Sequence, residues 1–366
     1  MEILIFIAVI VALIVVHELG HFIAAKAVGM RVDEFGLGYP PRALTVAKVG
    51  ETEYTLNWLP FGGFVKIYGE DGLTPEEARD ARAFSSKNRL AQATVLVAGV
   101  AMNLLFAYAL IAGALMIGTP RALSTGEAAI AHDVELAVAS VLPDSPAAHA
   151  GLLAGDAIIA AKDAVDEWHE SDPKSFSAFV AASGGSEVTL RVKRGREEHT
   201  AVAVPLAGIV RSDPSRYALG VEVATIGVLP LSLSAALIEG ASLTWGTTKM
   251  TAEGLWHFFA GIFTLSADLS QVAGPVGIAG VVGHAGEQGM SDLFSIMAII
   301  SINLALINII PIPALDGGRL LFVLIESIIR RPIRPSVTRA FNSISFVLLV
   351  LLMLVVTAHD IFKIVG

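Results

Sequence analysis

Residues 90–120 read LAQATVLVAGVAMNLLFAYALIAGALMIGTP and contain no Asp, Glu, Lys or Arg over 31 positions. A helix needs about 20 apolar residues to cross a hydrocarbon layer of about 30 Å, so this stretch predicts a membrane span. Residues 293–315 and 340–359 are uncharged over 23 and 20 positions and predict two more. The N-terminal apolar stretch is interrupted at His17 and Glu18 but resumes to Met30. We therefore expect a polytopic α-helical membrane protein with four transmembrane helices, at 1–29, 90–120, 291–315 and 339–364.

The composition agrees with a membrane protein and excludes several other classes. Of 366 residues, 54% are hydrophobic and only 16% are charged, and the mean hydropathy is +0.68. A soluble domain carries about a quarter charged residues. The chain has no cysteine, which excludes disulfides, cysteine-ligated zinc and thiol catalysis. The net charge of −9 gives no basic surface for nucleic acid, so we expect the lipid bilayer and no nucleic acid as a partner.

Basic residues predict the orientation of the spans. The cytoplasmic loop that we expect at 30–89 holds eight Lys and Arg, and the one at 316–338 holds four. Loops rich in Lys and Arg stay on the cytoplasmic side, so both termini and the long segment 121–291 lie outside the cytoplasm. A signal peptide is the alternative for the first apolar stretch, but Met1-Glu2 supplies an acid where a signal needs a base.

Within the long segment, residues 126–206 have the pattern of a soluble α/β module. Apolar residues alternate over 136–141, a helix is expected at 173–182, and a hairpin is expected from strands 188–192 and 200–204. This run resembles a PDZ domain, which binds an extended peptide as an added strand; the alternative is a spacer without a ligand. Residues 208–290 predict two helices at the membrane surface or against the bundle, at about 229–248 and 254–267.

The chemistry begins in the first span, at His17-Glu-Leu-Gly-His21. Residues four apart lie on one face of a helix, so both imidazoles can hold one metal ion. Glu18 can take the proton of an attacking water. Ionisable side chains are costly at membrane depth, and a divalent cation compensates them. The alternative is a polar helix face that packs on other helices or lines a proton path.

A catalytic zinc ion needs a third protein ligand. Asp316 closes the third span in the sequence NIIPIPALDGG over 308–318. Pro311 and Pro313 end the regular helix there, and Gly317-Gly318 permit a sharp backbone that brings Asp316 toward a neighbouring helix. Capping of the next helix is the alternative role of this carboxylate. Three glutamates of the first loop are the other candidate ligands: Glu34, Glu51 and Glu53.

These two motifs together resemble the bacterial site-2 proteases, the intramembrane zinc metalloproteases that include the regulators of sigma-E signalling. The likeness extends through Phe35-Gly-Leu-Gly38, Asn103, the PDZ-like module and Gly274-Pro-Val-Gly277. It implies that Zn²⁺ is bound by His17, His21 and Asp316, that Glu18 is the general base, and that Asn308 holds substrate or the transition state, with Asn303 sharing that role. The chain departs from the family pattern in Gly99-Val-Ala-Met-Asn103, where a Gly-Pro precedes the asparagine in other members, and in its single PDZ-like module.

A third feature concerns the substrate. Residues 54–59 and 61–67 alternate like strands around Pro60, with Gly62 and Gly63 at a bend, and resemble the family's membrane-entering β-loop. An edge strand that includes Gly62, Gly63 and Phe64 could pair with an extended substrate, because a transmembrane helix must be unwound before its peptide bonds can be reached. The alternative is a cytoplasmic hairpin without substrate contact.

The resemblance implies an intramembrane zinc endopeptidase in the bacterial cytoplasmic membrane, with the PDZ-like module outside. It would cut the transmembrane segments of single-span proteins, of the anti-sigma-factor or remnant-signal-peptide class, after another protease has removed their outer domain. The PDZ-like module would be a size filter or a receptor for a new peptide C-terminus. A metal or proton transporter and a catalytically silent scaffold are the competing functions; the first predicts polar residues along several spans, and the second has no need of Glu18.

Overall fold

The computed structural model describes residues 2–70, 80–195, 197–210, 213–264, 274–313, 315–331, 333 and 335–365. The chain forms two compact units. The first, the membrane unit, comprises residues 1–117 and 232–366, and the second, the PDZ-like unit, comprises residues 118–231. Each is described by itself.

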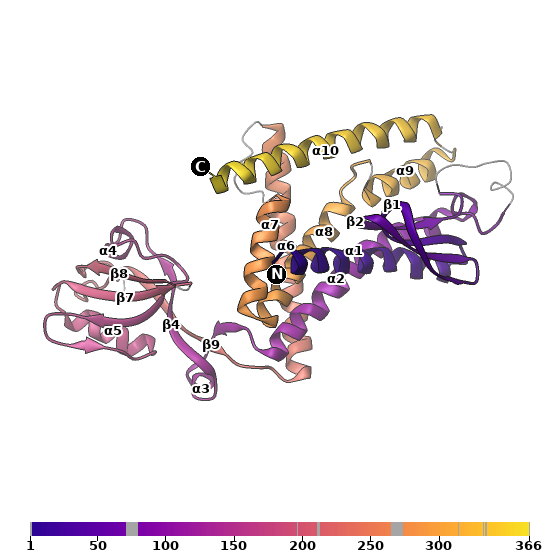
Figure 1. The fold of residues 1–366 in the computed structure, drawn as a ribbon. Coiled ribbons are helices and arrows are strands. Elements are labelled where there is room, and N and C mark those ends of the chain that lie inside the picture. Colours follow the sequence, from indigo (N-terminus) through magenta and orange to yellow (C-terminus); the bar gives the residue numbers. More distant parts are fainter. Residues whose placement is uncertain are drawn as a thin grey trace. The chain divides into compact units, whose positions relative to one another are not determined.

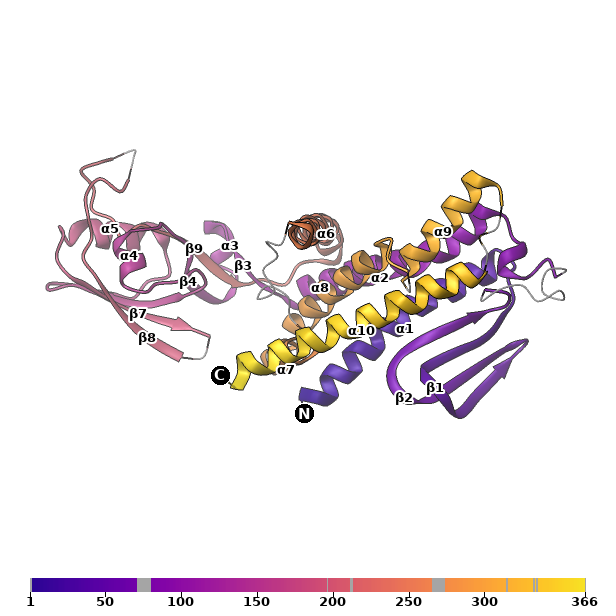
Figure 2. The same ribbon diagram turned by 90° about the horizontal axis from the view of Figure 1, so that it is seen from above.

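Helices dominate the membrane unit, and three of those described are long and apolar enough to cross a membrane: α1 (Glu2–Ala27), α2 (Arg89–Ile117) and α8 (Met290–Ile309). They lie side by side with α7 (Pro275–Gln288) against them (Figures 1 and 2). Buried apolar side chains fill the space between them: Val9, Leu13, Ala107, Leu110, Val282, Met297, Ala298 and Ile302. The first three expected spans are thus present as helices.

The remaining helices differ in part from the expectation. The segment predicted as two helices is one continuous helix, α6 (Leu233–Phe263), because its glycines and hydroxyl residues do not interrupt helical hydrogen bonding. Residues 265–267 lie outside the described residues. The predicted loop 316–338 contains an amphipathic helix, α9 (Asp316–Ile329), which Arg330 ends in the left-handed conformation. The expected fourth span falls in α10 (Pro335–Val365), and the count of four spans stays a prediction.

A small sheet follows α1 and contacts it (Figure 2). Its strands β1 (Val32–Val49) and β2 (Thr52–Ile67) are long and bent, so that each forms two limbs. The residue pairing places the limbs in the order 42–49, 52–59, 32–39 and 62–67. The limb 62–67 is one edge, and no further strand of the described chain pairs with it. A short 3-10 helix (Phe84–Ser86) then leads into α2.

The PDZ-like unit is a seven-stranded sheet with short helices. The strand order is β3-β9-β4-β5-β7-β8, with β6 paired to β5. Its elements are β3 (Pro120–Ala122), α3 (Thr125–Ala128), β4 (His132–Val141), α4 (Pro146–His149), β5 (Ala157–Lys162), β6 (Glu167–Trp168), α5 (Pro173–Ala182), β7 (Val188–Arg194), β8 (Glu197–Ala203) and β9 (Val221–Val228).

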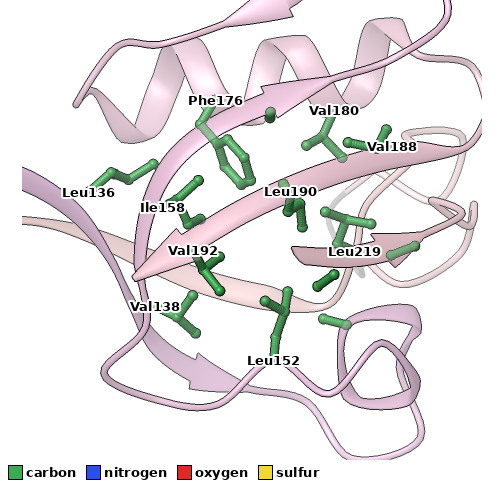
Figure 3. Packing of buried hydrophobic residues seen from close by; sticks show 14 of the residues in the cluster. Leu136, Val138, Leu152, Ile158, Phe176, Val180, Val188, Leu190, Val192 and Leu219 are labelled. Atoms are coloured by element: carbon green, nitrogen blue, oxygen red, sulfur yellow. The ribbon is translucent and has the colours of Figure 1, made fainter. Parts of the chain in front are cut away.

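The local signals in this unit act as expected. The predicted helix at 173–182 is α5, which starts at Pro173 and is capped by Asp172, whose carboxylate accepts a hydrogen bond from the Ser175 amide. The predicted hairpin is β7 and β8, with Val188 opposite Ala203. Apolar side chains of the sheet and α5 converge in one core (Figure 3). The unit is wider than the predicted 126–206, because β3 and β9 complete the sheet from outside that range.

Candidate metal centre

Two histidines and one aspartate meet at the centre of the membrane unit. His17 and His21 stand one turn apart on α1, and both are buried. The Asp316 Oδ2 lies 2.9 Å from the Nε2 of His17 and 3.2 Å from the Nε2 of His21. The two Nε2 atoms are 3.1 Å apart. Asp316 is 295 residues from His21 along the chain, so the fold brings together the two motifs that the sequence singled out.

The backbone between α8 and α9 places Asp316. Helix α8 ends at Ile309, two residues before Pro311, and α9 begins at Asp316. A Cβ on Gly317 would collide with the carbonyl oxygens at 309 and 310, and one on Gly318 with the carbonyl at 312. Glycine is therefore required for the close crossing of backbones that turns Asp316 inward. Asp316 also occupies the first turn of α9, where a carboxylate is favourable for the helix dipole.

Burial raises the pKa of the Asp316 carboxyl, but two imidazoles that carry a proton on Nε2 outweigh burial through hydrogen bonds and charge, and hold this pKa below its usual range. A bound metal ion would replace those protons and favour the same ionised form. A carboxylate is the form that binds a metal ion.

The three side chains fit zinc in donor type and in spacing. Their ligand atoms all lie within 4.8 Å of one another. Zinc accepts imidazole nitrogen and carboxylate oxygen at about 2.0–2.2 Å in tetrahedral geometry, which separates neighbouring ligand atoms by about 3.3 Å. The three separations, 2.9, 3.1 and 3.2 Å, need to widen only slightly around an ion. Two histidines and one carboxylate leave the fourth position open, as in catalytic zinc sites.

One face of α2 supports the two imidazoles. The Nδ1 of His21 donates to the backbone carbonyl of Val95 over 2.8 Å. The carboxamide nitrogen of Asn103 lies 3.2 Å from the Nδ1 of His17. Between them, a Cβ on Gly99 would lie 2.7 Å from Cε1 of His17 and closer still to the Nε2 of His21. Val95, Gly99 and Asn103 are spaced by four, so they share the helix face that meets the His17–His21 pair.

The sequence had not assigned this supporting role. Asn103 was noted for its place in the family order, and Gly99 only as part of a departure from the family pattern. The available signal was the four-residue spacing of Gly99 and Asn103, together with a polar amide in the middle of an uncharged span.

The other predicted site residues divide into two groups. The Nδ2 of Asn308 lies 3.5 Å from the Nε2 of His17, so this amide reaches the cluster. A Cβ on Gly63 would lie 3.4 Å from the Cγ of Glu18, so the limb 62–67, with Gly62 and Phe64, passes beside that glutamate. Asn303, in contrast, donates to the Ile299 carbonyl of its own helix over 3.1 Å. It is five residues, or about 140° of helix rotation, away from Asn308. Its substrate role stays a prediction.

The alternative third ligands have other partners. Glu34 accepts a hydrogen bond from the Thr55 hydroxyl and pairs with Arg42. Glu53 pairs with Arg42 and Lys48, and Glu51 pairs with Arg82. These contacts belong to the sheet and the loop after it, so Asp316 alone of the four acidic candidates meets the histidines.

Comparison with known proteins identifies the enzyme class. Residues 5–352 match peptidase family M50. This chain belongs to peptidase family M50. A Clostridium perfringens protein, named as a candidate zinc metalloprotease, is 36% identical over 96% of this chain and 95% of its own length. The zinc metalloprotease RasP of Oceanobacillus iheyensis is 28% identical over 95% of this chain and 96% of its own.

Two further similarities extend over a smaller share of the matched protein's own length. The chloroplastic membrane metalloprotease ARASP of Arabidopsis thaliana is 31% identical over 88% of this chain and 70% of its own length. A solved PDZ domain from an SdrC-like protein of Listeria monocytogenes is 24% identical, with a TM-score of 0.21, and covers 24% of this chain and 86% of that domain.

The M50 protease is therefore a zinc metalloprotease of the site-2 protease family, and the resemblance seen in its motifs is confirmed. Within the described residues, three helices are long and apolar enough to cross a membrane, in agreement with a membrane protein. The family acts on membrane-embedded substrates, which agrees with two candidate ligands on the apolar helix α1 and a third in the chain just after α8.

Proposed function

We propose that this enzyme hydrolyses peptide bonds within the membrane-spanning segments of single-span proteins, with zinc held by His17, His21 and Asp316. The observation that carries the proposal is the convergence of these three ligand atoms, within 4.8 Å of one another, from a candidate span and from the chain just beyond another. When bound, zinc lowers the pKa of a coordinated water and polarises the substrate carbonyl.

Glu18 and Asn308 would act on the reacting groups. Glu18 follows the ligand His17 directly, and it would take the proton of the attacking water and deliver it to the leaving amine. The amide of Asn308, 3.5 Å from the Nε2 of His17, would donate a hydrogen bond to the substrate carbonyl oxygen as negative charge develops there. Asn303 would at most contact substrate farther along α8.

The limb 62–67 would hold the substrate in an extended form. It is the edge of its sheet, and its residue Gly63 lies beside Glu18. A substrate strand added there would replace the helical hydrogen bonds that unwinding breaks, and its backbone would run past the general base. The limbs 42–49 and 52–59 of the same sheet expose Leu44, Val46, Leu56 and Trp58, which supports entry of this sheet into the membrane.

Replacement of Glu18 tests the mechanism. In the purified full-length enzyme, Glu18→Gln should retain zinc and lower cleavage of a tagged single-span substrate by about 10²–10⁴-fold, the usual contribution of a general base. Glu253→Gln is the matched control, because Glu253 is exposed on α6 and pairs only loosely with Lys249. Unchanged cleavage by Glu18→Gln would remove the proposed base, and full zinc occupancy in His21→Ala would remove the proposed metal site.

We further propose that the PDZ-like unit receives a peptide C-terminus. A groove lies between α5 and β9 and is lined by Phe176, Val180, Arg216, Leu219, Val221 and Val223. Strand β9 pairs with β4 along its length but with β3 only at residues 226–228, so the edge at 221–224 is not paired with another strand of the described chain. Apolar side chains and a free strand edge suit an added peptide strand, and Arg216 suits its carboxylate.

A peptide titration separates the receptor from the size filter. Fluorescent peptides with apolar ends should bind the full-length enzyme when their C-terminus is a free carboxylate and lose affinity when it is amidated. If neither the free-carboxylate peptides nor the amidated peptides bind, the result would favour a size filter. On the positive-inside rule, this unit faces the extracytoplasmic side of the bacterial cytoplasmic membrane, where a first protease would leave such an end on an anti-sigma factor or where a remnant signal peptide would present one. Protease access to the unit in intact cells compared with inverted vesicles tests that orientation.

A further inference from the structure

Asn103 is buried in the middle of α2 and tied into the helix packing. Its side chain is 0% exposed. Its backbone carbonyl accepts a hydrogen bond from the hydroxyl of Ser301 on α8 over 2.8 Å. Its carboxamide nitrogen lies 3.2 Å from the Nδ1 of His17. The other end of the carboxamide, Oδ1, is buried and has no hydrogen-bond partner within the described residues.

The chemistry of a metal-bound imidazole determines which end of that amide should face His17. A neutral imidazole carries one proton, and the nitrogen that binds a metal must be free of it. The Nε2 of His17 faces Asp316 and His21, so a zinc ion there requires the proton on Nδ1. A protonated Nδ1 needs an acceptor, and the only acceptor of the Asn103 side chain is Oδ1. A half turn of the carboxamide exchanges its two ends at nearly constant shape.

His21 shows the same arrangement on the same helix. Its Nδ1 faces the carbonyl oxygen of Val95, which can only accept, so Nδ1 carries a proton and the neutral ring that binds a metal leaves Nε2 free. Val95 and Asn103 are two helical turns apart on α2, and Gly99 between them leaves room for both rings. Helix α2 therefore places one polar partner against each histidine, the Val95 carbonyl against His21 and the Asn103 carboxamide against His17.

We infer that Asn103 is a positioning residue whose carboxamide oxygen accepts the Nδ1–H of His17 and so keeps the Nε2 of His17 free for zinc. The inference rests on the zinc site of the proposed function and extends it to a residue that touches neither metal nor substrate. Such partners of metal-bound histidines fix the tautomer and orientation of the ring, and their loss weakens metal affinity by about 10–100-fold.

Zinc affinity of two Asn103 variants, measured by competition with a chromogenic chelator, tests the inference on the full-length enzyme in detergent. Asn103→Leu keeps the size and removes the acceptor, and it should bind zinc about 10–100-fold more weakly. Asn103→Asp presents only acceptor oxygens, and it should bind zinc nearly as well as the wild type. Ser301→Ala is the matched control, because the Ser301 hydroxyl donates to the backbone carbonyl of Asn103 and not to its carboxamide, and it should leave zinc affinity unchanged.

The pattern across the variants distinguishes positioning from mere packing. If Asn103 served as a donor, Asn103→Asp would lose as much affinity as Asn103→Leu, and that result would overturn the inference. Wild-type affinity in Asn103→Leu would overturn it too. If Asn103→Leu fails to fold, as gel filtration and thermal melting would show, Asn103→Asp decides alone: a tenfold loss contradicts the inference and retained affinity supports it. A wild-type enzyme that binds no zinc would overturn the proposed function as well.

Discussion

The membrane unit and the PDZ-like unit place polar and apolar side chains in opposite ways. In the membrane unit, His17, His21 and Asn103 are buried, whereas Leu105 and Leu348 are more than half exposed. In the PDZ-like unit, Leu190 and its neighbours form a closed core (Figure 3). The solvent explains the difference, since lipid accepts apolar side chains on the outside and makes buried polar groups depend on one another. Buried polar side chains therefore indicate function in the membrane unit, and buried apolar side chains indicate stability in the PDZ-like unit.

The largest effect that this contrast predicts is at Gly99, where a single methyl group would enter the histidine cluster. The Cβ of Gly99→Ala would lie 2.7 Å from Cε1 of His17 and nearer to the Nε2 of His21, closer than real Cβ atoms approach. Zinc content should fall to background, and cleavage with it, although alanine favours the helix. Elemental analysis of the purified variant measures this. Gly246→Ala on α6, where no other atom lies within 4 Å of the added Cβ, should keep full zinc.

A change in the core of the PDZ-like unit should lower stability and leave the metal centre alone. Leu190 is fully buried in that core, and Leu190→Ala should destabilise this unit by about 2–5 kcal/mol through lost burial and a cavity. Hydrogen exchange of residues 118–231 in the full-length chain would report the loss. Val202→Ala on the neighbouring strand is the control, because Val202 is half exposed. A fall in zinc content of Leu190→Ala would show that the two units are energetically coupled.

Asp156 is the charged exception in the core of the PDZ-like unit. Its carboxylate accepts two hydrogen bonds from Arg194, at 2.7 and 2.8 Å, and one from the Leu153 amide at 2.9 Å. Hydrogen bonds to charged groups contribute about 1.5–3 kcal/mol, so Asp156→Asn should destabilise this unit by a similar amount at neutral pH. The upper end of this range, about 3 kcal/mol, is below the upper end expected for Leu190→Ala, about 5 kcal/mol.

The pH dependence of that effect has a defined sign. The hydrogen bonds from Arg194 hold the pKa of Asp156 below its usual range, although burial opposes them. The stabilisation is therefore complete above the unfolded pKa of about 3.9 and is lost as pH falls through the lower folded pKa. The stability gap between wild type and Asp156→Asn should narrow between pH 5 and pH 2 by hydrogen exchange or thermal melting. A gap that is constant over this range would contradict the ion-pair explanation.

The smallest effect is expected at Glu53, one of the acidic residues that the sequence offered as a third zinc ligand. Its carboxylate pairs with Arg42 and Lys48 on the sheet, in contact with solvent. Glu53→Gln should leave zinc content and stability unchanged, because solvent-exposed ion pairs contribute little. Asp316→Asn, measured in parallel, should lose zinc. The reverse result would return the third ligand to the glutamates of the first loop.

Several features could be predicted from residues alone. The uncharged runs located α2 and α8, and the apolar stretch interrupted at His17 and Glu18 located α1, because hydropathy along one segment is a local property. The spacing of His17 and His21 indicated one metal-facing surface, and Pro173 after Asp172 marked the start of α5. The break of α6 into two helices was wrong, since scattered polar residues are compatible with a continuous helix. The helix α9 was not predicted, because residues 316–338 were interpreted as a cytoplasmic loop from their basic residues alone.

By itself, the sequence determined which residues can bind a metal ion and which stretches can lie in a membrane, because both depend on side-chain chemistry and on spacing within one element. Only the tertiary structure decided that Asp316, and not Glu34, Glu51 or Glu53, meets the two histidines, and that Val95, Gly99 and Asn103 face them. Those contacts join residues from 74 to 299 positions apart. Residues so far apart in the sequence come into contact through helix packing and through close backbone crossings that require glycine, and neither can be read from a local sequence pattern.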